Sequence, residues 1–255
     1  MLAGWSLGAT RGPPQNRPPL VARAKPMPSR LTGISSMATR ALLAELSSAY
    51  EQRSGTAVAI ESVGGVDAAK RVQAGERFDV VVLASDALAK LAASGHVAPG
   101  SVAALVHSGV AVAVKAGAPR PDLSSEDTVK RAVLAARSIG YSTGPSGTAL
   151  LQLFERWGMG AQLEGRLVQA RAGVPVGSMV ASGEVELGFQ QRSELIHLPG
   201  IDLIGDLPEA IQIDTVFSAG LCTASAHPEA AAALIAFFAS PDTADAKRRQ
   251  GMTPA

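Results

Sequence analysis

The stretch FDVVVLASD, residues 78–86, decides the fold class of this 255-residue chain. An unbroken run of β-branched and apolar residues is followed at once by Ser85 and Asp86, which favour the start of a helix. Such a run is typical of a strand that is buried on both faces of a parallel sheet. The stretch therefore predicts a central strand over 78–85 and a helix from Asp86.

The same alternation of strand and helix extends outward from this stretch in both directions. Apolar runs bounded by Gly, Pro or Ser predict strands over 31–34, 56–62, 109–119, 137–142, 165–171, 185–191, 201–208 and 212–225. Helical spacing of apolar residues predicts helices over 35–50, 64–72, 128–137, 147–158, 175–184 and 227–240, the last being the final helix. Strands that alternate with helices predict βαβ units, and therefore an α/β fold.

Composition excludes several classes of function. The 23 basic and 22 acidic residues give a net charge of +1, which does not favour a nucleic-acid partner. The single cysteine, Cys222, and four scattered histidines do not have the spacing of a metal site, so neither a metal nor a cofactor is expected. The longest apolar run, at 230–239, is about half the ~20 residues that a membrane span needs, so no membrane-embedded segment is expected.

Residues 1–30 differ in composition from the remainder of the chain. They are rich in Pro, Gly and Arg, and they lack the apolar core of a secretory signal. They cannot bury enough apolar surface to become ordered, so a disordered tail is expected, with Met27 as a possible natural start. On the sequence as given, the expected location is the cytoplasm.

Four predicted turns from strand to helix share one chemistry. They are ISSMAT (34–39), SVGGVDA (62–68), YSTGPSGT (141–148) and RAGVPVG (171–177). The first N–H groups of a helix have no internal partner and carry partial positive charge, so such an end attracts anions. Taken singly, each turn is also explained by ordinary capping or turn geometry. Together they predict a small-anion site at the carboxyl ends of the strands. Its candidate residues are Ser35, Ser36, Gly64, Gly65, Ser146, Gly173 and Val174.

Several longer segments resemble the type II periplasmic binding proteins, and in particular their molybdate-binding branch, which serves ABC transporters. The segments are ISSMATRALLAEL, VQAGERFDVVVLASD, YSTGPSGTALLQLFERWG, ASGEVELGFQQRSEL and GMTPA, and the resemblance covers residues 31–255. It implies two lobes, each a mostly parallel sheet flanked by helices, with a ligand cleft between them. Lobe I would comprise 31–113 and 218–255, and lobe II 114–217. The resemblance also implies a monomer, a transporter permease as a possible partner, and a periplasmic location.

The match to the molybdate binders is uneven at the site. Ser36 occupies the place of the family's first serine contact, with Ser35 beside it. The family's second serine is missing at Gly64 and Gly65, and its closing tyrosine is replaced by Gln191. A glutamine offers both donors and acceptors, and Arg171 could hold a carboxylate bidentately. These departures favour an organic carboxylate over molybdate. Because side chains alternate along a strand, only one of Gln190 and Gln191 is expected to face the cleft, and Gln191 is preferred.

Two functions remain open on these residues. The favoured reading is a binding protein that encloses a small anion, either an organic carboxylate or a molybdate-like oxyanion. The alternative is an isomerase of a small tricarboxylate, because aconitate isomerases resemble this branch. That chemistry needs a base beside the buried substrate. Glu61 is the preferred base, with Asp67, Asp86 and Tyr141 as further candidates, although Glu61 could instead simply pair with Lys70 or Arg71.

Overall fold

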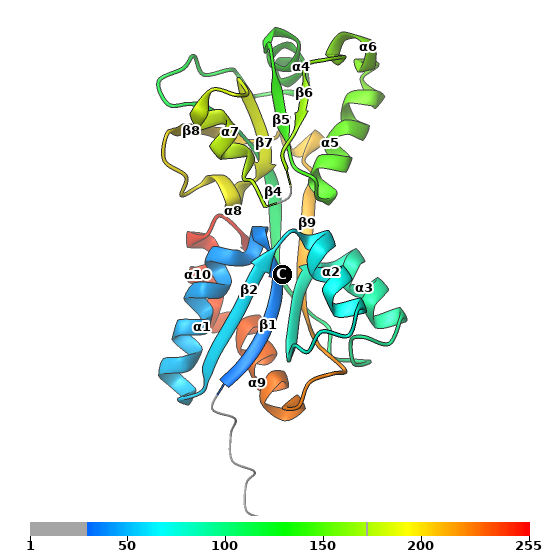
Figure 1. The fold of residues 1–255 in the computed structure, drawn as a ribbon. Coiled ribbons are helices and arrows are strands. Elements are labelled where there is room, and N and C mark those ends of the chain that lie inside the picture. The colour runs from blue at the N-terminus through cyan, green and yellow to red at the C-terminus, as the bar shows by residue number, and fades with distance from the viewer. Residues whose placement is uncertain (1–29, 172) are drawn as a thin grey trace, which may run out of the picture.

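The structure, a computed structural model, describes residues 30–171 and 173–255. The tail predicted over 1–30 therefore lies outside the described residues apart from Arg30, which begins the first strand. The chain forms two α/β lobes stacked end to end and joined by two long strands, β4 and β9 (Figure 1). The predicted α/β fold is confirmed.

Lobe I contains both ends of the described chain. Its strands and helices are β1 (Arg30–Ser36), η1 (Met37–Thr39), α1 (Arg40–Ser54), β2 (Ala57–Val63), α2 (Gly65–Gln73), β3 (Val80–Ala84), α3 (Ser85–Ala93), α9 (Pro228–Ala239), η3 (Pro241–Thr243), α10 (Ala244–Arg249) and β10 (Thr253–Pro254).

Lobe II is built from the middle of the chain. Its elements are α4 (Glu126–Ala135), β5 (Ile139–Tyr141), α5 (Pro145–Arg156), α6 (Gly160–Leu163), β6 (Leu167–Gln169), α7 (Val176–Ser182), β7 (Leu187–Gln191), α8 (Arg192–Leu195), β8 (Ile201–Asp206) and η2 (Glu209–Ile211). The joining strands are β4 (Ala103–Lys115) and β9 (Asp214–Leu221).

Strand β3 confirms the interpretation of the central apolar run. All of its residues are buried, and alternate side chains enter different cores. Val80 and Val82 pack in the core formed with α1 and α9, whereas Val81 and Leu83 pack in the core formed with α2 and α3. Each of these side chains therefore stabilises lobe I by burial, which is worth about 1.5–3 kcal/mol for a residue of this size.

The sheet runs continuously through both lobes in the order β2-β1-β3-β9-β4-β7-β5-β6. Within each lobe the outer strands are parallel, as the alternation predicted, but β4 and β9 run antiparallel to their neighbours. Strand β4 pairs with β9 from Ala103 to Gly109, and with β7 from Val110 to Val114. The exchange of partners therefore lies between Gly109 and Val110, N-terminal to the passage expected near Val114.

The end of the chain adds contacts that the sequence did not predict. Helix 227–240 is not the last, because α10 follows it and packs on α1. The closing residues then form β10, which pairs with β4 at His107 and Val106. Between these elements, Gln250 hydrogen-bonds His197 of lobe II at 2.9 Å. The short helices α6 and α8 were also not predicted, because each spans only about one turn.

Among the residues that the structure describes, none of the helices has both the length and the apolar character needed to cross a membrane.

The start of α5 predicts a large cost for a small substitution. A Cβ at Gly147 would lie 1.9 Å from the carbonyl oxygen of Ser142, because the helix passes close to the turn that precedes it. Gly147→Ala should therefore lower the free energy of unfolding by about 1–3 kcal/mol in urea denaturation. Gly160→Ala is the control, since a Cβ there meets no atom within 4 Å. Equal stability of the two variants would show that the close approach is not a constraint.

Candidate functional site

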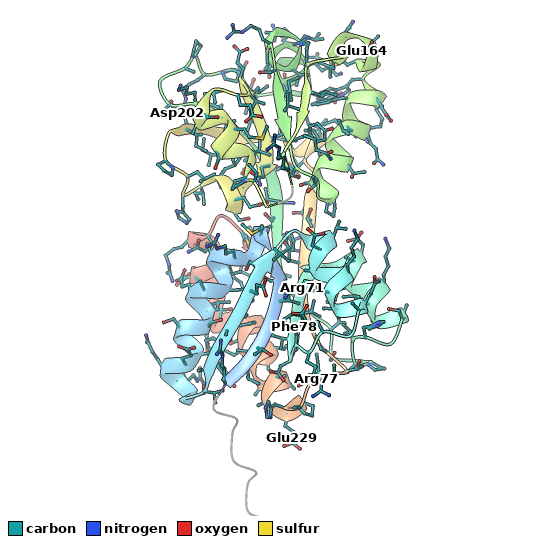
Figure 2. The ribbon with its side chains drawn as sticks, viewed as in Figure 1. Arg71, Arg77, Phe78, Glu164, Asp202 and Glu229 are labelled. Atoms are coloured by element: carbon teal, nitrogen blue, oxygen red, sulfur yellow. The ribbon has the colours of Figure 1, made fainter. Side chains whose placement is uncertain are left out.

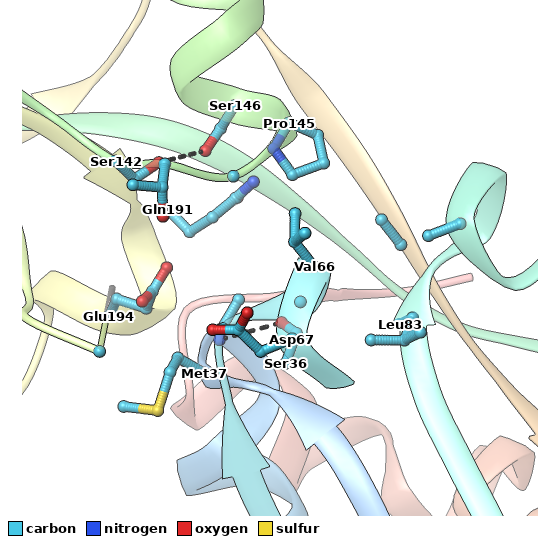
Figure 3. Close-up of a pocket in the computed structure, with 18 of the residues that line it drawn as sticks. Ser36, Met37, Val66, Asp67, Leu83, Ser142, Pro145, Ser146, Gln191 and Glu194 are labelled. Carbon is cyan, nitrogen blue, oxygen red and sulfur yellow. Dashed lines mark hydrogen bonds between the residues drawn. The ribbon is translucent and has the colours of Figure 1, made fainter. Parts of the chain in front are cut away.

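A cavity of about 570 Å³ lies between the lobes, and both lobes line it (Figure 3). It opens at the carboxyl ends of β1, β2 and β3 on one side and of β5, β6 and β7 on the other. Most of the sequence-predicted residues are brought together here. Lobe I contributes Ser36, Gly64 and Gly65, and lobe II contributes Ser146, Arg171, Gly173, Val174 and Gln191.

Ser35 is not among the residues that line this cleft. Its side chain is fully buried, and its hydroxyl lies 2.8 Å from the Ser62 hydroxyl and 3.3 Å from the Ser36 carbonyl. Successive residues of a strand point to opposite faces, so Ser36 reaches the cleft while Ser35 ties β1 to β2. The expectation that Ser35 contacts the ligand is therefore not supported by its position.

Glu61 also lies away from the cleft. Its carboxylate accepts two hydrogen bonds from Arg71, at 2.6 and 2.9 Å, and it lines a separate groove between α1 and β2. The Arg71 guanidinium lies 5.4 Å from the ring centre of Phe78, and both residues belong to lobe I (Figure 2). Hydrogen bonding from the Arg71 guanidinium lowers the pKa of the Glu61 carboxyl. The position of Glu61 does not suit the role of base, and the pairing with Arg71 is confirmed.

Three of the four predicted turns present helix N-termini to the cleft. Helix α2 follows Gly64 and α5 follows Gly144, and neither has a capping side chain. At η1 the Ser36 hydroxyl accepts a 3.2 Å hydrogen bond from the N–H of Ala38. At α5, Pro145 has no N–H and the N–H of Gly147 already donates to the Gly144 carbonyl at 3.0 Å. Among the described residues, the first-turn N–H groups of α2 and that of Ser146 remain without a partner and carry partial positive charge toward the cleft.

The fourth turn, before α7, is already occupied by protein groups. The N–H of Val174 donates to the Arg171 carbonyl at 3.0 Å, and the N–H of Val176 donates to Oε1 of Gln190 at 2.8 Å. Gly173 adopts φ +77°, a conformation that favours glycine. This turn therefore brings Arg171 to the cleft and satisfies much of its own backbone.

Both glutamines of the pair line the cleft, rather than Gln191 alone. Gln191 is the last residue of β7 and precedes α8 directly, so the strand alternation ends there. In the amide orientation that satisfies both its atoms, Gln191 donates to the Ser108 carbonyl at 2.9 Å and accepts from the Thr215 hydroxyl at 2.9 Å. It thus binds both joining strands, while Gln190 binds α7 and Glu194.

Four charged side chains line the cleft. The cations are Lys70 of α2 and Arg171, neither of which forms an ion pair with any residue in the described ranges. The acids are Asp67, in the first turn of α2, and Glu194 of α8. Two cations and several helix ends can therefore hold more than one carboxylate.

Glu194 is the functional candidate that sequence reasoning missed. Burial raises its pKa to about 7, and a 2.8 Å hydrogen bond from Nε2 of Gln190 opposes that rise. The carboxyl faces the cleft close to Met37 of the other lobe (Figure 3). The available signal was its spacing, because Glu194 stands four residues after Gln190, at the end of a strand that meets a ligand site.

The lobe I wall beyond the polar groups is apolar. Leu83, Ala84, Ala87 and Phe217 line it, and Val66 projects from α2 with 53% of its surface exposed. Such a wall suits a carbon skeleton better than it suits a bare oxyanion, whose surface is entirely polar.

The raised pKa of Glu194 has a consequence for stability that does not depend on function. A folded pKa near 7 exceeds the ordinary value of 4.5, so the folded state binds the proton more tightly and loses stability as pH rises from 4.5 to 7. Glu194→Gln should therefore raise the free energy of unfolding at pH 8 by about 1–3 kcal/mol, with a much smaller effect at pH 5. Urea denaturation at both pH values checks this. A difference that does not depend on pH would contradict it.

Comparison with known proteins places this geometry in a family. The chain is 40% identical over 244 residues to an aconitate isomerase from Pseudomonas sp., covering 92% of this chain and 91% of that protein. The periplasmic molybdate-binding protein of Azotobacter vinelandii superposes with a TM-score of 0.74 at 22% identity, covering 88% of this chain and 98% of that one. The sulfate-binding protein of Mycobacterium tuberculosis gives 0.72 at 16%, covering 89% and 87%.

These two structures support the two-lobed fold alone. The family model described as bacterial extracellular solute-binding protein matches residues 31–253, so the chain belongs to that family and has its small-ligand-binding fold.

Proposed function

We propose that this protein is an isomerase of a small unsaturated tricarboxylate, acting on aconitate or a close analogue. The observation that carries the proposal is the 40% identity to an aconitate isomerase over nine-tenths of both chains. The sequence alone favoured a receptor, because the anion-binding turns could be read from it while each candidate base also had an ordinary structural explanation. The relationship to an enzyme and a carboxyl group in the cleft now favour the alternative.

The charges of the cleft support a polycarboxylate as the ligand. Arg171 and Lys70 supply two positive charges, and the first turn of α2 and Ser146 of α5 supply N–H groups that lack an acceptor among the described residues. A trianion brings three carboxylates that can divide among these groups. The apolar wall at Leu83 and Phe217 can then contact the carbon skeleton.

A tetrahedral oxyanion is less well matched. The turn at Gly64, Gly65 and Val66 offers no hydroxyl, and Gln191 is committed to Ser108 and Thr215. Glu194 also faces the cleft, and a carboxylate beside a bound oxyanion would repel it. A plain receptor for an organic carboxylate remains the second candidate, favoured by the family's solute-binding fold.

The proposed reaction needs only a proton and a double bond to move. A base removes a proton from the methylene carbon beside a carboxylate, and the C–H electron pair spreads over the allylic system. The proton then returns to the former vinylic carbon, so the double bond shifts by one position. Atoms and electrons balance without an oxidant or reductant. The developing negative charge would be stabilised by Arg171, Lys70 and the helix N–H groups.

Titration calorimetry and ultraviolet absorbance test the proposal together. Wild-type protein should bind cis- and trans-aconitate, and incubation should convert either isomer to the same equilibrium mixture. Arg171→Lys should weaken binding by about tenfold or more, because a lysine cannot hold a carboxylate bidentately. Arg131→Lys, on the exposed side of α4, is the matched control. Tight binding without conversion would leave a receptor, and submicromolar molybdate binding with no response to tricarboxylates would overturn the proposal.

A further inference from the structure

We propose that Glu194 is the catalytic residue that carries the proton, and that Gln190 is the positioning residue that aims it. This inference rests on the proposed isomerase function and assigns its base. It replaces Glu61, which lies in a different groove and is paired with Arg71.

The first support is the place of Glu194 in the fold. It lies on α8, which begins directly after β7 in lobe II and packs against η1 of lobe I. Its carboxyl therefore lies where the two lobes meet, in the same cavity as Met37 and Asp67 of lobe I (Figure 3). Glu194 therefore lines the cavity that a ligand held by both lobes would occupy.

The second support is the hydrogen bonding of Gln190. Oε1 of Gln190 accepts a buried 2.8 Å hydrogen bond from the N–H of Val176. The Gln190 amide therefore cannot rotate by half a turn without losing this hydrogen bond. The Nε2 group is consequently directed at Oε1 of Glu194, also at 2.8 Å. One carboxylate oxygen is thereby fixed. The other has no hydrogen-bond partner within the described ranges and is available for a substrate proton.

The surroundings of Glu194 tune it for proton transfer near neutral pH. Burial raises its pKa to about 7, where a base is both ionised and strong. Arg192, its neighbour on α8, is tied to Asp206 at 3.0 Å. The charged groups that line the same cleft are Asp67 and Lys70 of α2 and Arg171 before α7. The last two are placed to hold substrate carboxylates.

The chemical step uses one carboxyl group twice. Glu194 takes a proton from the substrate methylene, which breaks a C–H bond and forms an O–H bond. The resulting carboxylic acid then gives the proton to the carbon at the other end of the allylic system. Glu194 returns to its carboxylate form, and the two carbons lie close enough together for a single carboxyl to serve both.

Asp67 is the other acid in the cleft. It is exposed, it lies in the first turn of α2, and no side-chain amide of the described residues donates a hydrogen bond to it. The geometry therefore favours Glu194, and the two assignments can be separated by variants.

Steady-state kinetics with aconitate tests the assignment. Glu194→Gln should lower kcat by about 100-fold or more, while calorimetry shows an affinity for the ligand within roughly tenfold of wild type. Glu61→Gln makes the same chemical change outside the cleft and should retain turnover. If Glu194→Gln keeps wild-type kcat, or if Asp67→Asn alone abolishes turnover, Glu194 is not the base. If wild type itself does not convert aconitate, the proposed function fails, and the assignment falls with it.

The pH profile tests the role of Gln190. In wild type, kcat/KM should rise with pH and level off above about 7, as Glu194 ionises. Gln190→Met removes the donor that stabilises the carboxylate, so the rise should move to higher pH, whereas a general loss of stability would lower the whole curve. An unshifted profile would show that Gln190 does not act through Glu194.

Discussion

The shared strands β4 and β9 are the constraint on which the architecture of the site depends. Strand β9 pairs with β3 of lobe I, β4 pairs with β7 of lobe II, and β4 and β9 pair with each other. The sheet is therefore continuous between the lobes only through these two strands. Gln191 ties the end of β7 to both of them, through Ser108 of β4 and Thr215 of β9. Because these bonds lie in the passage between the lobes, they fix where the carboxyl end of β7 meets lobe I.

The chemistry of the cleft follows from this arrangement. The parallel strands of the two lobes direct their carboxyl ends at the same cavity, and the helix α2 that follows β2 points its positive end into it. Arg171 and Lys70 add full charges to these partial ones. Beside these groups lies the half-buried carboxyl of Glu194, whose pKa is raised to about 7 by desolvation.

The sequence predicted the fold and most of the cleft, for identifiable reasons. An apolar run such as 80–84 can only be buried on both faces, and strand-to-helix turns must collect at one edge of a parallel sheet. Which side of a strand a residue faces was harder to predict. Ser35 and Glu61 stand at the right ends of the right strands but point away from the cleft. Glu194 was missed because α8 is a single turn, whose direction is set by contact with the opposite lobe.

One measurement tests the central claim, transfer of a proton between two carbons, most directly. Aconitate enriched with ¹³C at its methylene carbon is incubated with the wild-type protein, and the product isomer is examined by NMR. The account predicts that the label appears at the vinylic carbon of the product, because the double bond has moved. A label that stays at the methylene carbon of the product would mean rotation about a fixed double bond, and would contradict the account.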